Sequence, residues 1–325
     1  MRFIIYGAGA IGGTLGARLF QHNHEVVLIA RGDHLEAIRQ KGLMLVTPDT
    51  ELLQPIPVVG DPSELDPRDD DVVLLTMKTQ HSWDAMLALR DVYGATVPVI
   101  CCQNGVENER MASRLFQNVY GMIVMSPANH FEPGIVESNS NAMSGVLDAG
   151  CYPKGVDELI SLVTAIIDDS NFSAVADDDI MRWKYKKLLM NLNNSLQAIT
   201  EMGVATTEIA NRVQEEALAV YHAAGIVPPS ANEFRERQGS LVVMKPIKGQ
   251  RRTGGSSWQS LKNGKGDIET DYLNGEIASL GRQFGVATPV NTALQVLASK
   301  AARQGLAPGS LELVEIEALI LKLGG

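Results

Sequence analysis

Short apolar runs alternate with helical patterns over the first half of the chain. Runs of this length are typical of strands buried on both faces of a parallel sheet, and they lie at residues 2–6, 25–29, 72–76, 97–102 and 119–124. Segments with helical spacing separate several of them, at residues 14–20, 34–40 and 83–90. This alternation predicts an α/β fold built on a doubly wound parallel sheet.

Further extended segments predict an antiparallel extension of this sheet. Residues 43–59 are strand-like but are interrupted by prolines. Residues 131–136 form a turn between extended segments, which predicts a hairpin with residues 142–147 as the partner strand. Residues 156–168 have helical spacing, and residues 172–175 resemble a last strand.

The strand patterns largely cease after residue 177. Asp179 can cap a long helix that begins at residue 180. Beyond it, helical patterns are separated by glycine and proline breaks. The sequence therefore predicts two domains, an α/β domain at residues 1–177 and a mainly α-helical C-terminal domain at residues 178–325.

A glycine-rich motif follows the first predicted strand at once and opens the first predicted helix: Gly7, Ala8, Gly9, Ala10, Ile11 and Gly12. A dinucleotide site requires strand, glycine turn and helix in this order. Gly7 permits the tight turn, Gly9 lets the backbone approach a pyrophosphate, and Gly12 lets helix and strand pack closely. The helix N-terminus offers unpaired N–H groups to the phosphates. The first domain is therefore predicted to be a Rossmann-type dinucleotide-binding domain.

Polar residues follow three of the predicted strands, at the carboxyl ends of the strands, where open α/β sheets bind ligands. Arg31 stands close to twenty residues past the glycines, where NAD enzymes usually carry an acidic residue, and it can pair with a 2′-phosphate. The alternative is a solvated loop arginine. Lys78 and Asn104 follow the next two buried strands. Asn104 precedes Gly105, so an ordinary Asn-Gly turn is an equal alternative for it.

The first helix of the second domain presents polar groups in register. At about 100° per residue, Asn191 lies roughly 40° from Lys187, and Asn194 lies roughly 20° away on the other side. An amine and two amides beside an apolar flank indicate a polar seam in a cleft. A solvated Lys/Asn face is the alternative. Lys186 points about 100° away from Lys187.

The C-terminal half contains a second set of polar residues. Ser256 and Ser257 follow two glycines, and Glu269 stands twelve residues after Ser257. The serines could begin a helix as capping residues, a reading that is compatible with ligand binding.

Composition narrows the classes of partner. The net charge of −10 argues against nucleic acid or an anionic membrane, and no run approaches the length of a transmembrane helix. The chain begins with a predicted strand rather than a signal peptide. The cysteines show neither metal spacing nor a disulfide framework, which fits a reducing compartment. We expect a cytoplasmic protein with a small-molecule substrate and no metal site; a homodimer is one option that the sequence leaves open.

Taken together and in this order, these motifs resemble those of the ketopantoate reductase (2-dehydropantoate 2-reductase) family over nearly the whole chain. The resemblance implies a Rossmann domain followed by a helical domain, with the active site in the cleft between them. It also implies NADPH as the cofactor. The expected activity is reduction of a 2-oxo acid to a 2-hydroxy acid, with ketopantoate to pantoate, a step of pantothenate biosynthesis, as the first reaction to test.

The resemblance further implies a role for each matching residue. Lys187 matches the catalytic lysine, which donates a proton and stabilises the developing alkoxide. Glu269 matches a carboxylate that contacts the cofactor's ribose or orients the site. The other cofactor-binding matches are Gly7, Ala8, Gly9, Ala10, Ile11, Gly12, Arg31, Lys78 and Asn104. The substrate-binding matches are Asn104, Lys187, Asn191, Asn194 and Ser257.

Departures from the family pattern all fall on the substrate side. The spacing from Asn191 to Asn194 is one residue shorter than the family often has, and Ser195 takes the slot of the second asparagine or of the proline after it. A further family asparagine has no counterpart in residues 200–203. Trp258 replaces a smaller residue, and an aspartate that follows it in the family is missing. Two alternatives therefore stay open: a family reductase of another 2-oxo acid or an opine-like compound, and an NADPH-binding regulator without activity.

Overall fold

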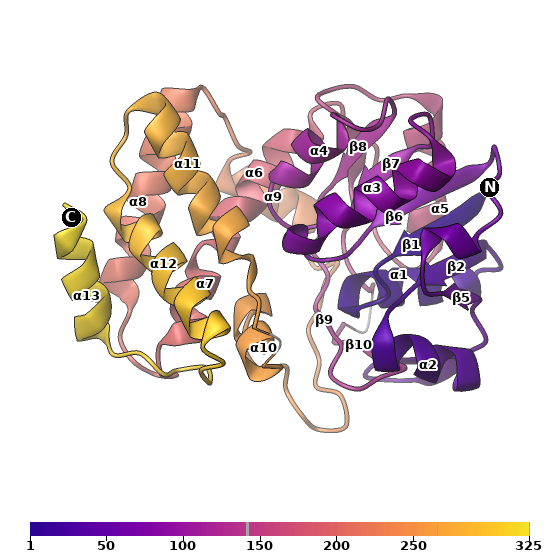
Figure 1. Ribbon diagram of the computed structural model, residues 1–325, viewed down its shortest axis with the longest axis horizontal. Helices are drawn as coiled ribbons and strands as arrows, with labels where there is room; N and C mark the ends of the chain where they lie inside the picture. The colour runs from indigo at the N-terminus through magenta and orange to yellow at the C-terminus, as the bar shows by residue number, and fades with distance from the viewer. Residues whose placement is uncertain (141–142, 265, 325) are drawn as a thin grey trace. The chain divides into compact units, whose positions relative to one another are not determined.

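The computed structural model describes residues 1–140, 143–264 and 266–324. The chain packs as two compact units (Figure 1). The first unit comprises Met1–Lys184 and Pro229–Arg252, and the second comprises Tyr185–Pro228 and Thr253–Gly325.

The first unit is built on a seven-stranded sheet with the order β11-β8-β7-β6-β1-β2-β5. All of its neighbouring strands are parallel except β11, which pairs antiparallel with β8 at one edge. Its strands are β1 (Arg2–Tyr6), β2 (Glu25–Ile29), β5 (Val58–Val59), β6 (Asp71–Leu75), β7 (Val99–Cys101), β8 (Val119–Met122) and β11 (Ala149–Cys151). The α/β fold with a parallel sheet and an antiparallel extension is thus confirmed.

A second, four-stranded sheet was not expected. Its order is β4-β3-β10-β9, with β3 (Leu43–Val46), β4 (Glu51–Gln54), β9 (Ala128–Asn129) and β10 (Ile135–Ser138). The hairpin around the turn at residues 131–136 is present, because β10 pairs antiparallel with β9. The partner predicted at residues 142–147 is wrong as far as it is described: Val146 bridges Met125 and Ser173 instead, and residue 142 lies outside the described residues.

The predicted last strand at residues 172–175 is also wrong as a regular strand. This segment pairs with its neighbour only through isolated bridges, Val146 to Ser173 and Ala149 to Ala176. Asp148 lies between the two bridges and accepts the N–H of Val175 through its side chain, where a strand would use a backbone carbonyl. The side-chain acceptor explains why the ladder is interrupted there.

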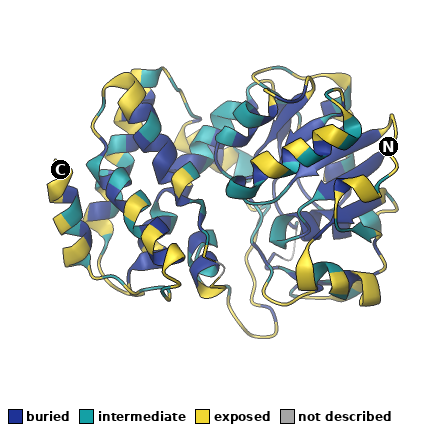
Figure 2. Cartoon of the chain, viewed as in Figure 1, coloured by how far each residue is buried: buried dark blue, intermediate teal, exposed yellow. Residues whose placement is uncertain are grey.

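The helices of the first unit cover the sheet and bury one side each. They are α1 (Ala10–Gln21), α2 (Gly32–Lys41), α3 (Ser82–Tyr93), α4 (Glu107–Ala112), α5 (Glu158–Asp169) and α9 (Ala231–Gln238), with short 3-10 turns η1 (Pro62–Glu64) and η2 (Thr79–His81). In Figure 2 the strands are dark blue along most of their length, whereas α2 and α3 carry exposed residues on one side. This is the pattern of a sheet covered on both faces by amphipathic helices.

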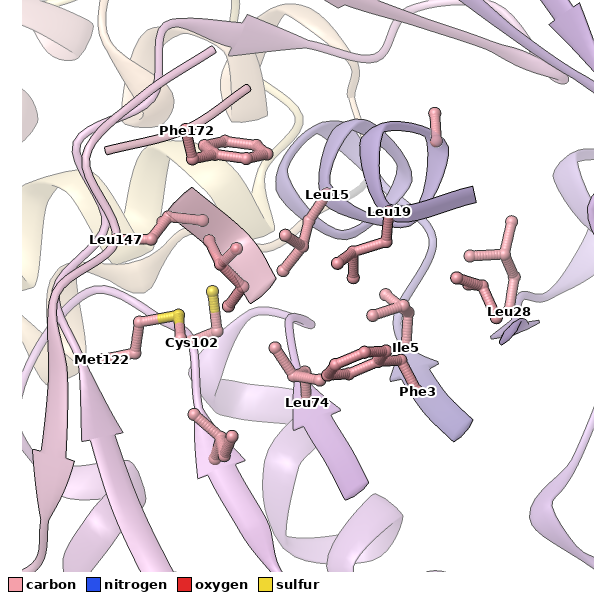
Figure 3. Close-up of a cluster of buried hydrophobic side chains, with 14 of the residues drawn as sticks. Phe3, Ile5, Leu15, Leu19, Leu28, Leu74, Cys102, Met122, Leu147 and Phe172 are labelled. Carbon is pink, nitrogen blue, oxygen red and sulfur yellow. The ribbon is translucent and has the colours of Figure 1, made fainter. Parts of the chain in front are cut away.

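The core between the sheet and α1 is formed by alternate residues of the strands (Figure 3). Phe3 and Ile5 of β1 point to the same face and lie with Leu15 and Leu19 of α1. All four side chains have no exposed surface. A fully buried leucine or phenylalanine contributes on the order of 2–3 kcal/mol, so this layer fixes α1, and with it the glycine motif, against the sheet.

The second unit is mainly helical, as predicted. Its elements are α7 (Asn193–Ile199), α8 (Thr207–Ala224), α10 (Ser256–Lys262), α11 (Asn274–Phe284), α12 (Pro289–Arg303), α13 (Leu313–Lys322) and the 3-10 turn η3 (Glu269–Tyr272). Helix α12 packs against α7, α8, α11 and α13. Helix α6 (Ile180–Asn191) belongs to the first unit up to Lys184 and to the second from Tyr185.

The division into units differs from the boundary predicted at residues 177 and 178. Residues 178–184 and 229–252 pack with the first unit. Phe234 of α9 joins a buried cluster with Ile123 and Ile180, and Arg237 Nε donates to Asp148 Oδ2 at 2.8 Å. These contacts join residues far apart in the chain, so the local sequence pattern carries no trace of them.

Within the described residues, no helix combines the length and apolarity that a membrane span needs. Cys101, Cys102 and Cys151 are free. Burial raises the pKa of the Cys102 thiol to about 12 and raises that of Cys101 as well. Both thiols therefore stay protonated at neutral pH and serve as core side chains.

Candidate active site

Two glycines of the motif, Gly7 in the loop after β1 and Gly12 in the first turn of α1, cannot be replaced without strain. Gly7 has a φ of +110°, and a Cβ there would lie 2.7 Å from the backbone nitrogen of Met77. A Cβ at Gly12 would lie 2.3 Å from the carbonyl oxygen of Gly7. At Gly9, by contrast, no atom lies within 4 Å of the Cβ position. The tight turn and the close packing are therefore observed, and the backbone at Gly9 faces open space.

The N-terminus of α1 is not capped by a side chain. Gly9 is the N-cap residue and makes no side-chain hydrogen bond to the helix, and Ala10 and Ile11 are half-buried. The first N–H groups of a helix have no intrahelical partner and carry a partial positive charge. This end of α1 can therefore receive an anion such as a pyrophosphate.

His34 supports the same loop, and the sequence analysis did not single it out. Its Nδ1 accepts the N–H of Gly134 at 2.8 Å, so its hydrogen is on Nε2, which lies 2.7 Å from the carbonyl oxygen of Ala8. The ring also packs on His130, with 4.1 Å between the ring centroids. A neutral His34 thus joins the glycine loop to the turn before β10. In the sequence, the only indication of this contact is the position of His34 near the start of the second predicted helix.

Arg31 lies at the same edge of the sheet as the glycine loop. Tyr6 pairs with Ile29 in the parallel register, so the ends of β1 and β2 lie side by side. Arg31 is exposed and is the N-cap residue of α2. Burial raises the pKa of Tyr6 at the end of β1, and the positive charge of Arg31 opposes that rise.

Lys78 and Asn104 follow β6 and β7 at this edge, and both are half-buried. Their loops are tied together: Gln103 Nε2 donates to the carbonyl oxygen of Met77 at 2.8 Å and to Ser82 Oγ at 2.7 Å. The structure thus places the glycine loop, Arg31, Lys78 and Asn104 at the carboxyl ends of neighbouring parallel strands.

In the second unit, the long helix predicted through Ser195 is broken. Helix α6 ends at Asn191 and α7 begins at Asn193, and Leu192 N–H donates to the carbonyl oxygen of Leu189 at 3.4 Å, one residue short of an α-helical bond. The carbonyl of Leu192 accepts Asn274 Nδ2 at 3.0 Å. Lys187 and Asn191 lie four residues apart on α6, and Leu192 keeps right-handed helical angles, φ −59° and ψ −34°, between α6 and α7.

Ser195 is committed to the interior of the second unit. Its Oγ contacts Asn274 Oδ1 at 2.7 Å and Thr270 Oγ1 at 2.9 Å, and it has no exposed surface. Asn274 continues this buried network to Asn291. Ser195 therefore cannot provide the hydrogen bonds that the family's second asparagine would offer to a ligand.

Asn194 instead faces the start of α10. Its Nδ2 lies 3.4 Å from Ser256 Oγ, and the neighbouring N–H of Gly255 donates to Gln197 Oε1 at 2.9 Å. Ser257 follows Ser256 on the first turn of α10 and is 2% exposed. Packing of α7 against α10 thus brings Asn194 and the two serines together.

Asn191 and Glu269 complete the predicted residues of the second unit. Asn191 is 6% exposed, and its Nδ2 has no hydrogen-bond partner among the described residues. A buried amide without a partner is costly, and binding of a ligand acceptor would remove that cost. Glu269 is half-buried and begins η3, next to Thr270 of the Ser195 network. Residues 1–140, 143–264 and 266–324 contain no group of three acidic, histidine or cysteine side chains that could hold a metal ion.

Two family models match the chain, one for each half. "Ketopantoate reductase PanE/ApbA" matches residues 3–153, and "Ketopantoate reductase PanE/ApbA C terminal" matches residues 179–302. The chain belongs to the ketopantoate reductase family. The resemblance inferred from the motifs is thus confirmed.

Individual ketopantoate reductases show the same likeness over their full length. The 2-dehydropantoate 2-reductase of Pyrococcus horikoshii is 28% identical, covering 95% of this chain and 100% of that protein. The enzyme of the same name from Mesorhizobium japonicum is 27% identical, covering 93% and 98%. The crystal structure of a ketopantoate reductase of this family from Ralstonia eutropha JMP134 has a TM-score of 0.79 at 28% identity, covering 94% and 99%.

The fold extends to more distant enzymes. D-mandelate dehydrogenase, solved with NADH and anilino(oxo)acetate, has a TM-score of 0.80 at 23% identity, covering 94% of this chain and 99% of that one. At this identity the likeness shows the fold alone. The ketopantoate reductase family is an oxidoreductase family, so the chain is an oxidoreductase with a nicotinamide cofactor.

Proposed function

We propose that the chain reduces 2-dehydropantoate to pantoate with NADPH, as a step of pantothenate biosynthesis. The observation that carries this proposal is the pair on α6: Lys187 and, one turn later, Asn191, whose buried Nδ2 has no partner. An NADPH-binding regulator without activity has no need of this pair, so we favour an enzyme.

The residues of the first unit fit the cofactor. Gly9 leaves room for a pyrophosphate at the N-terminus of α1, Arg31 would pair with the 2′-phosphate, and Lys78 and Asn104 would border the nicotinamide. When bound, NADPH supplies the hydride. The net charge of −10 provides no global attraction for this anion, so these local groups must hold it.

The residues of the second unit would hold and protonate the substrate. Asn191, Asn194 and Ser257 are hydrogen-bond donors for the carboxylate and the carbonyl oxygen of a 2-oxo acid. The Lys187 ammonium would stabilise the negative charge that develops on that oxygen and donate a proton to it. Glu269 would contact the cofactor's ribose or orient these groups.

Another 2-oxo acid is the second candidate substrate, because two features depart from the family on this side. The hydroxyl of Ser195 is hydrogen-bonded within the buried network of Thr270 and Asn274. Trp258 is half-buried, with Lys262 Nζ 5.1 Å from its ring centroid. A Cβ at Gly254 would lie 2.5 Å from the Trp258 ring, so the glycine is needed to accommodate this bulky side chain.

An assay of NADPH absorbance with a panel of 2-oxo acids tests the proposal. We expect ketopantoate to give the highest kcat/KM of the panel. Faster turnover of any 2-oxo acid other than ketopantoate, or of a 2-oxo acid together with an amino acid, would identify the second candidate. Binding of NADPH without turnover of any compound would identify a regulator.

Replacing Arg31 with alanine is expected to weaken NADPH binding far more than NADH binding. A charge-assisted pair is worth about 1–3 kcal/mol, which corresponds to roughly 5- to 150-fold in Kd. Isothermal titration with both cofactors measures the difference. Equal losses for NADPH and NADH would show that Arg31 does not contact the 2′-phosphate.

A further inference from the structure

Lys184 is a lysine buried in the interior of the first unit, one helical turn before Lys187 on α6. Its side chain is 1% exposed and the side chain of Glu109 is fully buried; Lys184 Nζ and Glu109 Oε1 are 2.6 Å apart. The ammonium also donates to the carbonyl oxygens of Gln103 at 2.9 Å, Cys101 at 3.2 Å and Met122 at 3.2 Å. Four oxygens from three segments thus enclose one ammonium.

These partners lie at or just after the carboxyl ends of β7 and β8. Cys101 ends β7, Met122 ends β8, and Gln103 directly precedes Asn104. Glu109 belongs to α4, which follows the Asn104 loop. The carboxylate lies over Gly121 of β8, where a Cβ would come within 3.3 Å of Glu109 Oε1.

Stability alone does not explain this ion pair. Moving two charges out of water costs several kcal/mol per ion, and apolar residues of similar volume often fill such a site as stably or more so. Burial raises the pKa of Glu109, and the nearby Lys184 opposes that rise. What the pair provides, and apolar residues would not, is a directional attachment of α6 to the strand ends.

We propose that Lys184 and Glu109 are positioning residues for the reduction: their ion pair fixes the turn of α6 that precedes Lys187 to the strand ends beside Asn104. This inference rests on the proposed function of Lys187. A helix rises 1.5 Å per residue and is stiff over one turn, so the placement of Lys184 is transmitted to Lys187. A displacement of about 1 Å at a reacting group can cost on the order of 100-fold in rate.

The test compares two buried ion pairs of the same unit. In one double variant, Lys184→Met and Glu109→Gln remove both charges and keep the side-chain volumes. The control double variant carries Arg2→Met and Asp71→Asn. Arg2 Nε and Asp71 Oδ1 are also 2.6 Å apart, with side chains 11% and 0% exposed, but they lie at the opposite, amino ends of β1 and β6.

Whatever the change in the stability of either double variant, we expect only the Lys184/Glu109 variant to lose roughly 10- to 100-fold in kcat. Its Kd for NADPH should stay within about threefold of wild type. Amide hydrogen exchange of the unliganded proteins provides a second readout. In the Lys184/Glu109 variant, the amides of residues 103–106 and 185–191 should exchange at least about tenfold faster, while the control leaves them unchanged.

Unchanged kcat and exchange in the Lys184/Glu109 variant, or equal changes in both variants, would overturn the positioning role. Wild-type turnover in the same assay tests the proposed function separately, and the exchange comparison decides the positioning role even where the wild type is inactive. Should the double variant fail to fold, Glu109→Asp keeps the charge but shortens the side chain. It should then give a smaller loss in kcat and faster exchange in the same two segments, and wild-type behaviour in both would overturn the proposal.

Discussion

Replacing Lys187 with alanine should abolish most of the turnover while leaving NADPH binding close to that of the wild type. Loss of a general acid commonly costs about 10²- to 10⁴-fold, and loss of the positive charge beside the developing alkoxide adds to this. Lys187 is half-buried on the face of α6 that also carries Asn191. Steady-state kinetics with ketopantoate, together with titration of NADPH, measures both quantities.

Lys186→Ala is the matched control for this substitution. Lys186 lies on the same helix and is also half-buried, but its side chain points about 100° away. Turnover within a few-fold of wild type is expected. A comparable loss in both variants, or near-normal turnover of Lys187→Ala, would move the catalytic role to another residue.

Replacing Gly12 with alanine should destabilise the first unit and weaken NADPH binding together. The new Cβ would lie 2.3 Å from both the carbonyl oxygen of Gly7 and Thr76 Oγ1. Thr76 Oγ1 already donates to the carbonyl oxygens of Tyr6 and Gly7, so it is not free to move. Overpacking of this kind costs about 1–3 kcal/mol or more. Urea unfolding and NADPH titration follow the two effects.

Gly9→Ala separates the two effects, because no atom lies within 4 Å of its Cβ position and its φ of −72° suits alanine. We expect the free energy of unfolding to fall by less than about 1 kcal/mol. NADPH binding should still weaken, because the methyl group enters the space proposed for the pyrophosphate. Unaltered NADPH affinity in Gly9→Ala would show that the cofactor lies elsewhere.

The sequence allowed the first domain to be predicted because its signals are local. Continuous apolar runs identify strands buried on both faces, and a glycine motif between strand and helix leaves little choice of conformation at Gly7 and Gly12. The parallel order also places Arg31, Lys78 and Asn104 at one edge of the sheet, whatever the details of the loops.

The features that were missed depend on contacts between distant parts of the chain. The return of residues 229–252 to the first unit depends on packing of Phe234 with Ile123 and Ile180. At the break between α6 and α7, the carbonyl of Leu192 accepts a hydrogen bond from Asn274, some eighty residues away in the chain. The hydrogen bond from His34 to the carbonyl oxygen of Ala8 likewise joins two segments whose contact no local sequence pattern predicts.

Ser195 shows how the structure changes the interpretation of a residue. From spacing alone, Ser195 could have taken the place of a family asparagine. Its contacts with Thr270 and Asn274 assign it to the interior instead. Asn194, beside Ser256, is therefore the better candidate for the second substrate amide.

Isotope transfer tests most directly whether hydride passes from NADPH to C2 of a 2-oxo acid. The wild-type protein is incubated with ketopantoate and NADPH that carries deuterium at both C4 positions, and the product is analysed by mass spectrometry. We predict pantoate that carries one deuterium, bound to C2. Formation of pantoate without deuterium, or consumption of NADPH without any pantoate, would contradict the claim.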